Sequence, residues 1–316
     1  MRNLLLCLVL TALTAPAALA GVSLPYGTGA GQVSFYNANN HPDAEEPVPL
    51  GPLSFRVAGG DFWIADSVAG RIFHVDGQGK VLATLAVPKS GPVILIEDIA
   101  LIRDAAGKVQ GVWALNGGAQ EVVRLALDGT VVKKFGTRGD EPGTFVQMHR
   151  LEVGPDGRLF IADKGRQKIL VFSPEGAFER EVPWQWSGLC LDAAGNLCRL
   201  VWDDAAKVNH LVVETPEGKP VKDVVLDLGT HFDPELWFLN DQGEACLTFT
   251  PATGFEGTFT FAVCGADGKP VKRAELKPPI AMNRYLDKAE TGLFLGVADY
   301  NDPPKGEFKI EAWSPK

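Results

Sequence analysis

The chain repeats one pattern of four short strands, and this repeat limits its fold more than any other feature. The clearest copy spans residues 135–182, with apolar segments at 151–153, 159–163, 169–172 and 178–182. Tight turns of the Pro-Asp-Gly and Pro-Glu-Gly type separate these segments. Four short antiparallel strands in a unit of this length are typical of one β-propeller blade.

Looser copies of the pattern occur at residues 53–87, 95–135, 188–228, 235–276 and from 292 to the C-terminus. The last residues of the second strands mark the period: Asp66, Asn116, Asp163, Asp203, Thr250 and Asp299. The intervals between them are 50, 47, 40, 47 and 49 residues. Six copies at this spacing predict an all-β fold, a six-bladed β-propeller of four-stranded antiparallel blades over residues 21–316.

The last copy contains only three strands before the chain stops at Lys316. Its fourth strand must therefore come from another part of the sequence. Residues 31–36, with the alternating segment Gln32-Val33-Ser34-Phe35-Tyr36, precede the first complete copy. We expect this N-terminal strand to pair with the last blade and close the ring, because closure covers an exposed sheet edge.

The copy at 135–182 resembles the NHL repeat. It contains Phe135-Gly136, the Asp156-Gly157 turn, the strand end Phe160-Ile161-Ala162-Asp163 and the strand Lys168-Ile169-Leu170-Val171-Phe172. The copy at 53–87 is similar, and the other four follow the motif more loosely. The resemblance implies a toroid with a central channel.

The first twenty residues have the features of a signal peptide. Arg2 provides a positive start, residues 4–13 are apolar, and Ala18-Leu19-Ala20 is a small-x-small cleavage site. The apolar run is too short to span a bilayer, and charges or glycines interrupt the later ones, so we expect no transmembrane segment. We therefore predict an exported protein, periplasmic or extracellular, and monomeric unless it joins an envelope assembly. Its net charge of −9 offers no electrostatic footprint for nucleic acid.

Cleavage after Ala20 removes Cys7 and leaves four cysteines. An even number of cysteines in an exported chain favours disulfides. Cys190 and Cys198 flank a tight turn, and Cys246 and Cys264 flank another, so two local bridges, 190–198 and 246–264, are predicted. The alternative is four buried free thiols.

Propellers bind ligands mostly at one face, near the mouth of the channel, where the innermost strands begin. Alignment of the copies on their first strands places a polar and aromatic set at this mouth: Glu97, Asp98, His149, Arg150, Trp186, Glu235, Asn283 and Arg284. Such a ring suits a small polar ligand or a cation. The alternative is a solvated rim that contains ordinary salt bridges.

A second resemblance concerns peptidyl-glycine α-amidating lyases, which look like six-bladed NHL propellers that bind zinc through histidines at the starts of inner strands. His149 matches one such histidine, whereas Glu97, Ser187 and Asn283 occupy the equivalent places here. The three-histidine zinc site therefore does not carry over. Gluconolactonase-type propellers surround one cation with a glutamate, an asparagine and an aspartate, which Glu97 and Asn283 match in part. Together these residues define a candidate site for calcium or zinc: Glu97, His149 and Asn283.

Two functions remain open from the sequence. The first is a binding or scaffold module that holds a protein, peptide or glycan at the channel-mouth face, with no catalytic residue assigned. Trp184 and Trp186 support a glycan, because aromatic rings beside carboxylates are a carbohydrate-binding signature. The second is a metal-dependent hydrolase or lyase in which the cation polarises an oxygen or activates water. The chain has neither a Gly-x-Ser-x-Gly nor a His-Glu-x-x-His motif.

Overall fold

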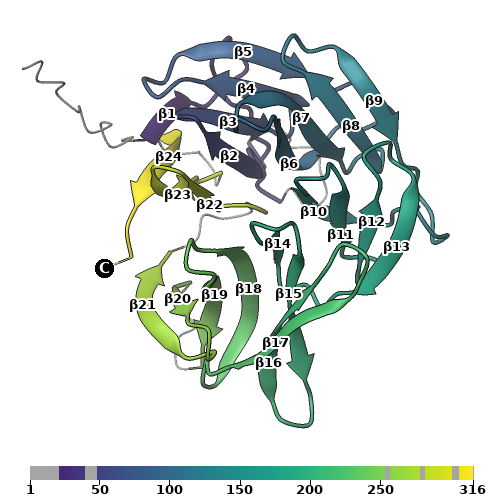
Figure 1. The fold of residues 1–316 in the computed structure, drawn as a ribbon. Helices are drawn as coiled ribbons and strands as arrows, with labels where there is room; N and C mark the ends of the chain where they lie inside the picture. Colours follow the sequence, from purple (N-terminus) through teal and green to yellow (C-terminus); the bar gives the residue numbers. More distant parts are fainter. Residues whose placement is uncertain (1–20, 40–47, 253–256, 278–281, 301–305, 316) are drawn as a thin grey trace, which may run out of the picture.

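A computed structural model describes residues 21–39, 48–252, 257–277, 282–300 and 306–315. Its 24 strands form six four-stranded antiparallel sheets around a common axis, so the predicted six-bladed propeller is confirmed (Figure 1). No helix long and apolar enough to cross a membrane occurs in this part of the chain. The predicted signal peptide, residues 1–20, lies outside the described residues.

The blades follow one another along the chain. Blade 1 consists of β2 (Ser54–Ala58), β3 (Asp61–Asp66), β4 (Arg71–Val75) and β5 (Val81–Ala86). Blade 2 consists of β6 (Ile96–Arg103), β7 (Val109–Asn116), β8 (Glu121–Ala126) and β9 (Val131–Phe135). Blade 3 consists of β10 (Met148–Val153), β11 (Leu159–Asp163), β12 (Lys168–Phe172) and β13 (Phe178–Pro183).

Blade 4 consists of β14 (Leu189–Leu191), β15 (Leu197–Asp203), β16 (Val208–Glu214) and β17 (Pro220–Leu226). Blade 5 consists of β18 (His231–Leu239), β19 (Ala245–Pro251), β20 (Phe259–Cys264) and β21 (Pro270–Leu276). Blade 6 contains β22 (Leu286–Ala289), β23 (Gly292–Val297), β24 (Glu307–Trp313) and the N-terminal β1 (Gly21–Pro25).

Within each blade the strands pair in sequence order, and the first strand lies nearest the axis (Figure 1). Burial follows this order. Every residue of β11 is buried, whereas the outermost strand β9 is almost entirely exposed. Tight turns join the strands, and their aspartates accept backbone hydrogen bonds: Asp104 Oδ1 accepts from the amides of Ala106 and Lys108. Each repeat of the sequence therefore corresponds to one blade of four strands joined by tight turns.

The strand that closes the ring is β1, not residues 31–36 as predicted. Gly21 pairs with Glu311 and Pro25 pairs with Glu307, which makes β1 the outer strand of blade 6. Residues 31–36 mimic a strand because Val33 is buried, but their backbone bonds go elsewhere. The Val33 amide donates to the Pro25 carbonyl, and the Ser34 amide donates to the Asp66 carboxylate.

The hydrophobic core lies between neighbouring blades. One cluster joins blades 2 and 3, for example, through Trp113, Leu151 and Phe172. Another joins blades 5, 6 and 1 and includes the inward-facing Val22 and Leu24 of β1. Since each blade buries its faces against two neighbours, the ring is stable only when it is closed.

The four cysteines of the described chain are free and buried, so the two predicted disulfides are absent from the structure. Cys190 and Cys198 do face each other across β14 and β15, as the turn between them predicts. In blade 5, however, Cys264 pairs with Ala245 and Cys246 pairs with Val263. Cys246 and Cys264 therefore point to opposite faces of the sheet and pack in different core clusters.

Candidate functional site at the channel mouth

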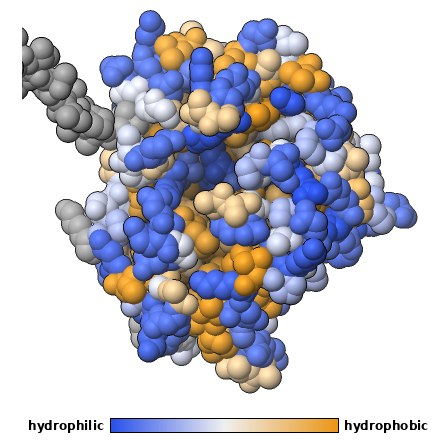
Figure 2. Space-filling model, in the orientation of Figure 1, coloured by the Kyte–Doolittle hydropathy of each residue, from blue (hydrophilic) through white to orange (hydrophobic). Residues whose placement is uncertain are grey.

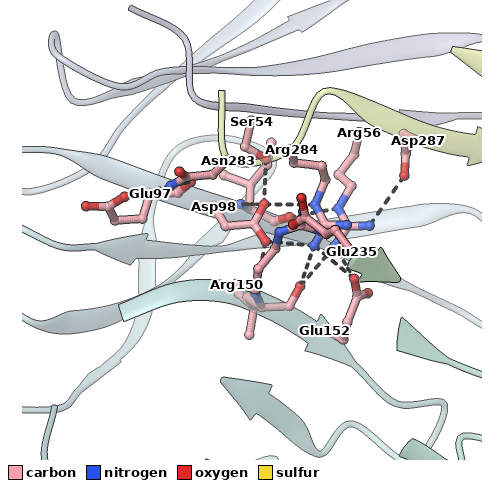
Figure 3. Close-up of polar contacts among 12 residues, drawn as sticks. Ser54, Arg56, Glu97, Asp98, Arg150, Glu152, Glu235, Asn283, Arg284 and Asp287 are labelled. Atoms are coloured by element: carbon pink, nitrogen blue, oxygen red, sulfur yellow. Dashed lines mark hydrogen bonds and ion pairs between the residues drawn. The ribbon is translucent and has the colours of Figure 1, made fainter. Parts of the chain in front are cut away.

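A fully buried ion pair lies at the axis. Asp98 at the start of β6 accepts hydrogen bonds from Arg284 Nε at 3.0 Å and from Arg284 Nη2 at 2.8 Å (Figure 3). The Ser54 hydroxyl and the Leu151 amide also donate to Asp98. Burial raises the pKa of Asp98, but its bonds to Arg284 and the charges of Arg284, Arg56 and Arg150 outweigh this effect and hold that pKa below its usual value.

The ion pair extends into a network toward the far end of the inner strands. Glu152 of β10 accepts from Arg284 at 2.9 Å and from Arg56 of β2 at 3.1 Å. Arg56 also lies 3.4 Å from Asp287 of β22. Blades 1, 2, 3 and 6 are thus joined through their innermost strands, and the channel is filled with paired charges at this level.

Arg150 of β10 adds blade 5 to the network. Its Nη2 forms an ion pair with Glu235 of β18, and its guanidinium lies 4.3 Å from the centre of the Trp237 ring. Nε and Nη1 of this completely buried side chain have no hydrogen-bond acceptor among the described residues. The Trp237 ring takes the place of a hydrogen-bond acceptor for this guanidinium, because the face of an indole attracts a cation. Blade 4 contributes no charge here, since its inner strand β14 is Leu189-Cys190-Leu191.

Glu97 and Asn283 lie on the mouth side of the network, away from Arg56 and Asp287 (Figure 3). The Asn283 amide nitrogen donates to Glu97 Oε2 at 2.7 Å and to the Glu97 backbone carbonyl at 3.1 Å. Burial raises the pKa of Glu97 to about 7, although the Asn283 hydrogen bond and the charge of Lys164 oppose the shift. This carboxyl therefore exchanges its proton near neutral pH.

Two further titratable groups share the mouth. His149 is buried with its ring centre 6.2 Å from that of Trp184, and burial holds the pKa of His149 well below its usual value. Lys164 follows β11 in the loop that leads to the third strand of blade 3, and burial lowers its pKa as well. The His149 imidazole is therefore neutral at physiological pH, and its unprotonated nitrogen can accept a hydrogen bond or bind a cation.

The structure brings the eight predicted mouth residues together only in part. Asp98 joins Arg284, Arg150 joins Glu235, and Glu97 joins Asn283. Trp186 lies apart on the surface, where its Nε1 donates to the Lys164 carbonyl. The network members that the sequence analysis missed are Arg56, Glu152, Asp287 and Lys164. The first three were detectable, because they stand two or three residues beyond mouth positions on the same inner strands, where side chains alternate between faces.

Two of the three predicted cation ligands, Glu97 and Asn283, contact each other through the Asn283 side-chain nitrogen. Asn283 directs its nitrogen at both oxygen acceptors of Glu97, so its side-chain oxygen faces away from the Glu97 carboxylate. A cation shared by Glu97 and Asn283 requires this amide to rotate and both hydrogen bonds to break. Among the residues that the structure describes, no cluster of three histidine, cysteine, aspartate or glutamate side chains is arranged to hold a metal.

The opposite mouth, at the turns between first and second strands, opens into a cavity of about 790 Å³. Arg56, Glu152 and Asp287 line it together with residues of the turns in blades 2 and 3. The surface view shows a hollow near the centre of one face, surrounded by hydrophilic residues (Figure 2).

Comparison with known proteins supports the architecture. No protein-family model matches the chain. A segment of 49 residues is 43% identical to tripartite motif-containing protein 3 of Rattus norvegicus; the match covers 16% of this chain and 7% of that protein. These two comparisons do not establish the NHL-repeat family.

Solved structures of propeller shape cover most of the chain. A protein of unknown function from Bacteroides caccae is 14% identical, with a TM-score of 0.53 over 82% of this chain and 94% of its own. A streptogramin B lyase is 15% identical, with a TM-score of 0.50 over 84% of both chains. The PQQ-bound aldose sugar dehydrogenase of Streptomyces coelicolor is 16% identical, with a TM-score of 0.50 over 83% of this chain and 94% of its own. At these identities the similarity shows the fold alone.

Proposed function

We propose that the protein is an exported binding module that holds a protein, peptide or glycan on the face where its inner strands begin. One observation carries the proposal. Most charges at the axis are paired with one another and tie the blades together, while the exposed aromatic side chains Trp186, Trp202 and Phe232 stand on the face where the inner strands begin. A rigid scaffold with exposed loops is a common basis for recognition.

Capture from the native envelope fraction tests this function. The mature chain, immobilised through its C-terminus, should retain a reproducible partner or glycan, and the variant Trp186→Ala should retain less. Val271→Ala is a matched control, because Val271 is 61% exposed on the outer strand β21, away from the mouth. Equal retention by all three proteins, or reproducible absence of any retained molecule, contradicts the proposal.

Export is part of the same proposal. The first described residue, Gly21, begins the ring-closing strand, so cleavage after Ala20 leaves every described strand intact. Mass spectrometry of the protein from a periplasmic or culture fraction should find an N-terminus at Gly21. Recovery of the full-length chain from the cytoplasm alone contradicts export.

The second candidate is a hydrolase or lyase, and the position of Glu97 favours it. A carboxyl with a pKa of about 7 beside a neutral histidine and a lysine has the properties of a general acid or base. Elemental analysis of protein purified without chelators tests the metal-dependent form. Stoichiometric calcium or zinc that is lost in His149→Ala supports it; absence of metal and of any thermal shift with either ion removes it.

A further inference from the structure

A cleft lies beside the channel mouth, between blades 4 and 5. Its inner part is a cavity of about 220 Å³ lined by Gln185, Ser187, Trp202, Asn209 and residues 231–234. A second cavity of about 600 Å³ continues it along the outer side of the same two blades. Trp202, His231 and Phe232 line both, so the two cavities form one continuous cleft.

Two exposed aromatic side chains lie at this cleft. Among the described residues, three large aromatic side chains expose more than a third of their surface: Trp186 at 57%, Phe232 at 49% and Trp202 at 36%. Trp202 and Phe232 line the cleft, and Trp186 lies between two lining residues in sequence. Exposure of the Trp202 and Phe232 rings at one place costs hydrophobic free energy, which a bound partner would recover.

In the described part of the chain, neither lysine nor arginine lines the inner cavity. The Gly229 carbonyl, 2.7 Å from His231 Nδ1, requires this nitrogen to donate, and Nε2 then accepts from the Asn209 side-chain nitrogen at 2.7 Å. Asn209 Oδ1 remains an acceptor without a partner in the described chain. Gln185 uses its oxygen to accept from the Trp202 amide, which leaves its nitrogen as a donor.

Backbone strain is concentrated at the same place. Among the residues that the structure describes, five other than glycine have a left-handed backbone: Gln120, Gln167, Trp186, Lys207 and Asp233. Three of them, Gln120, Gln167 and Lys207, stand immediately before the third strand of blades 2, 3 and 4, so the shared loop geometry accounts for them. Trp186, at φ 59°, and Asp233, at φ 49°, have no such explanation, and both flank the cleft.

Local close packing holds these two segments in position. Gly188 forms a bridge to Leu236 of β18, and a side chain at 188 would meet the Leu236 carbonyl oxygen at 2.2 Å. The pairing of β18 with β19 is shifted between Phe232 and Glu235, which turns residues 233–234 out of the ladder. Strained backbone that surrounding contacts enforce is typical of ligand sites.

We propose that this cleft binds a neutral saccharide. A sugar ring stacks its C–H face on Trp202 or Phe232, and its hydroxyls bond to Asn209 Oδ1, the Gln185 amide nitrogen and the Asp233 carboxylate. Uncharged donors and acceptors in the inner cavity suit vicinal hydroxyls. The lysine that lines the outer cavity, Lys207, pairs with Asp204 at 2.7 Å, which leaves less of its charge for a phosphate or carboxylate ligand. The inference rests on the proposed binding function and adds to it the ligand class and the place.

The test is a binding screen of the mature protein against an array of neutral oligosaccharides, an array of anionic glycans and a library of unmodified peptides. A neutral oligosaccharide found in the screen is then titrated by calorimetry. Trp202→Ala should weaken its binding by about tenfold or more, because a stacked ring is lost. Asn209→Ala should also weaken it, whereas Val271→Ala should leave it unchanged.

The outcomes separate this proposal from the general one. Binding of neutral sugars that depends on Trp202 supports both. Binding of peptides or anionic glycans alone overturns the saccharide assignment and leaves the binding module standing. Neutral-sugar binding that Trp202→Ala and Asn209→Ala do not alter, in variants that melt like the parent, overturns the cleft assignment. No binding in any of the three screens overturns the saccharide proposal and, together with a failed capture experiment, the binding function.

Discussion

At the scale of single residues, the buried pair of Asp98 and Arg284 makes the sharpest prediction. Asp98 has no exposed side-chain surface, and the Arg284 side chain is 2% exposed. Removal of one partner leaves the other charge buried without compensation, which costs about 3–5 kcal/mol. Arg284→Met should therefore lower the free energy of unfolding by about this amount in urea denaturation.

The double variant Asp98→Asn, Arg284→Met provides the control. It removes both charges, so it should be more stable than the sum of the two single losses predicts. The pKa of Asp98 is lowered in the folded protein, so the pair stabilises at pH values above the unfolded carboxyl's pKa. Its contribution is lost as the pH falls through the folded pKa. If the stability lost in the double variant equals the sum of the losses in the two single variants, Asp98 and Arg284 are not coupled.

Glu97 makes the opposite prediction for pH dependence. Its pKa rises to about 7 on folding, so in the folded state the carboxyl holds its proton at pH values where the unfolded chain has released it. Between the unfolded pKa and about 7, the wild-type protein should lose stability with rising pH relative to Glu97→Gln, by about 1.4 kcal/mol for each pH unit. Urea midpoints of both proteins at about pH 4.5, 6 and 8 span this interval and measure the loss. A constant difference across that range contradicts the buried position of Glu97.

What the sequence reveals about residues depends on periodicity. The alignment of repeats found Glu97, Asp98, Arg150 and Arg284 because the inner strands start at corresponding places. It placed Asn283 at the mouth but not the direction of its amide, since that direction depends on contacts between blades. The cleft residues Trp202 and Asn209 were also missed, because they belong to β15 and β16, whose sequence pattern indicates ordinary strands.

At the scale of elements, β1 determines whether the ring closes. Val22 is 8% exposed and Leu24 is 3% exposed, and both pack on blade 6 and its neighbours. Burial of two such side chains contributes about 3–6 kcal/mol. Deletion of residues 21–25 should therefore lower the melting temperature by roughly 10 °C. The chain that starts at Gly21 is the control, and equal melting of the two proteins contradicts the assignment of β1.

Sequence patterns alone favoured residues 31–36 over β1 for this role. Both segments alternate, and periodicity does not distinguish a strand in a ladder from an extended segment that packs one side chain. The structure separates them by their bonds: β1 pairs along its whole length with β24, whereas Val33 makes one isolated bridge, to Tyr26.

The cysteine-bearing strands predict low thiol reactivity. Burial raises the pKa of Cys246 to about 12 and that of Cys264 to about 11, and the pKa of Cys190 is also raised, through its hydrogen bond with Cys198 and through burial. Because the thiolate is the reactive form, the native mature chain should react slowly with Ellman's reagent at about pH 8. In denaturant all four thiols should react. Fewer than four under those conditions would falsify the free-thiol arrangement.

At the scale of the whole molecule, two features hold the ring together. One is strand exchange, in which the N-terminal β1 completes the C-terminal blade 6, and the other is the network of charges at the axis. The six-fold repeat was predictable because each blade repeats the same local pattern of short strands and tight turns. The network was predictable only in part, because its side chains meet across blades that are distant in sequence: Arg284 contacts Asp98, 186 residues away. We therefore expect the six blades to unfold together as long as β1 is paired with β24 and closes the ring.

A pair of circular permutants tests this reasoning. Gly21 pairs with Glu311, so a short turn can join the two natural ends. In one permutant the chain is opened in the turn at Asp128-Gly129, so that β9 becomes an N-terminal strand that completes blade 2 and links it to blade 3. In the other, the chain is opened at Gly139-Asp140 in the connection between the blades. Only contacts between the two blades then hold that seam, namely side-chain packing and hydrogen bonds such as that of the Leu151 amide to Asp98. The first should melt at least ~5 °C above the second, a difference of about 2 kcal/mol. Equal melting temperatures would show that packing between blades, rather than strand exchange, closes the ring.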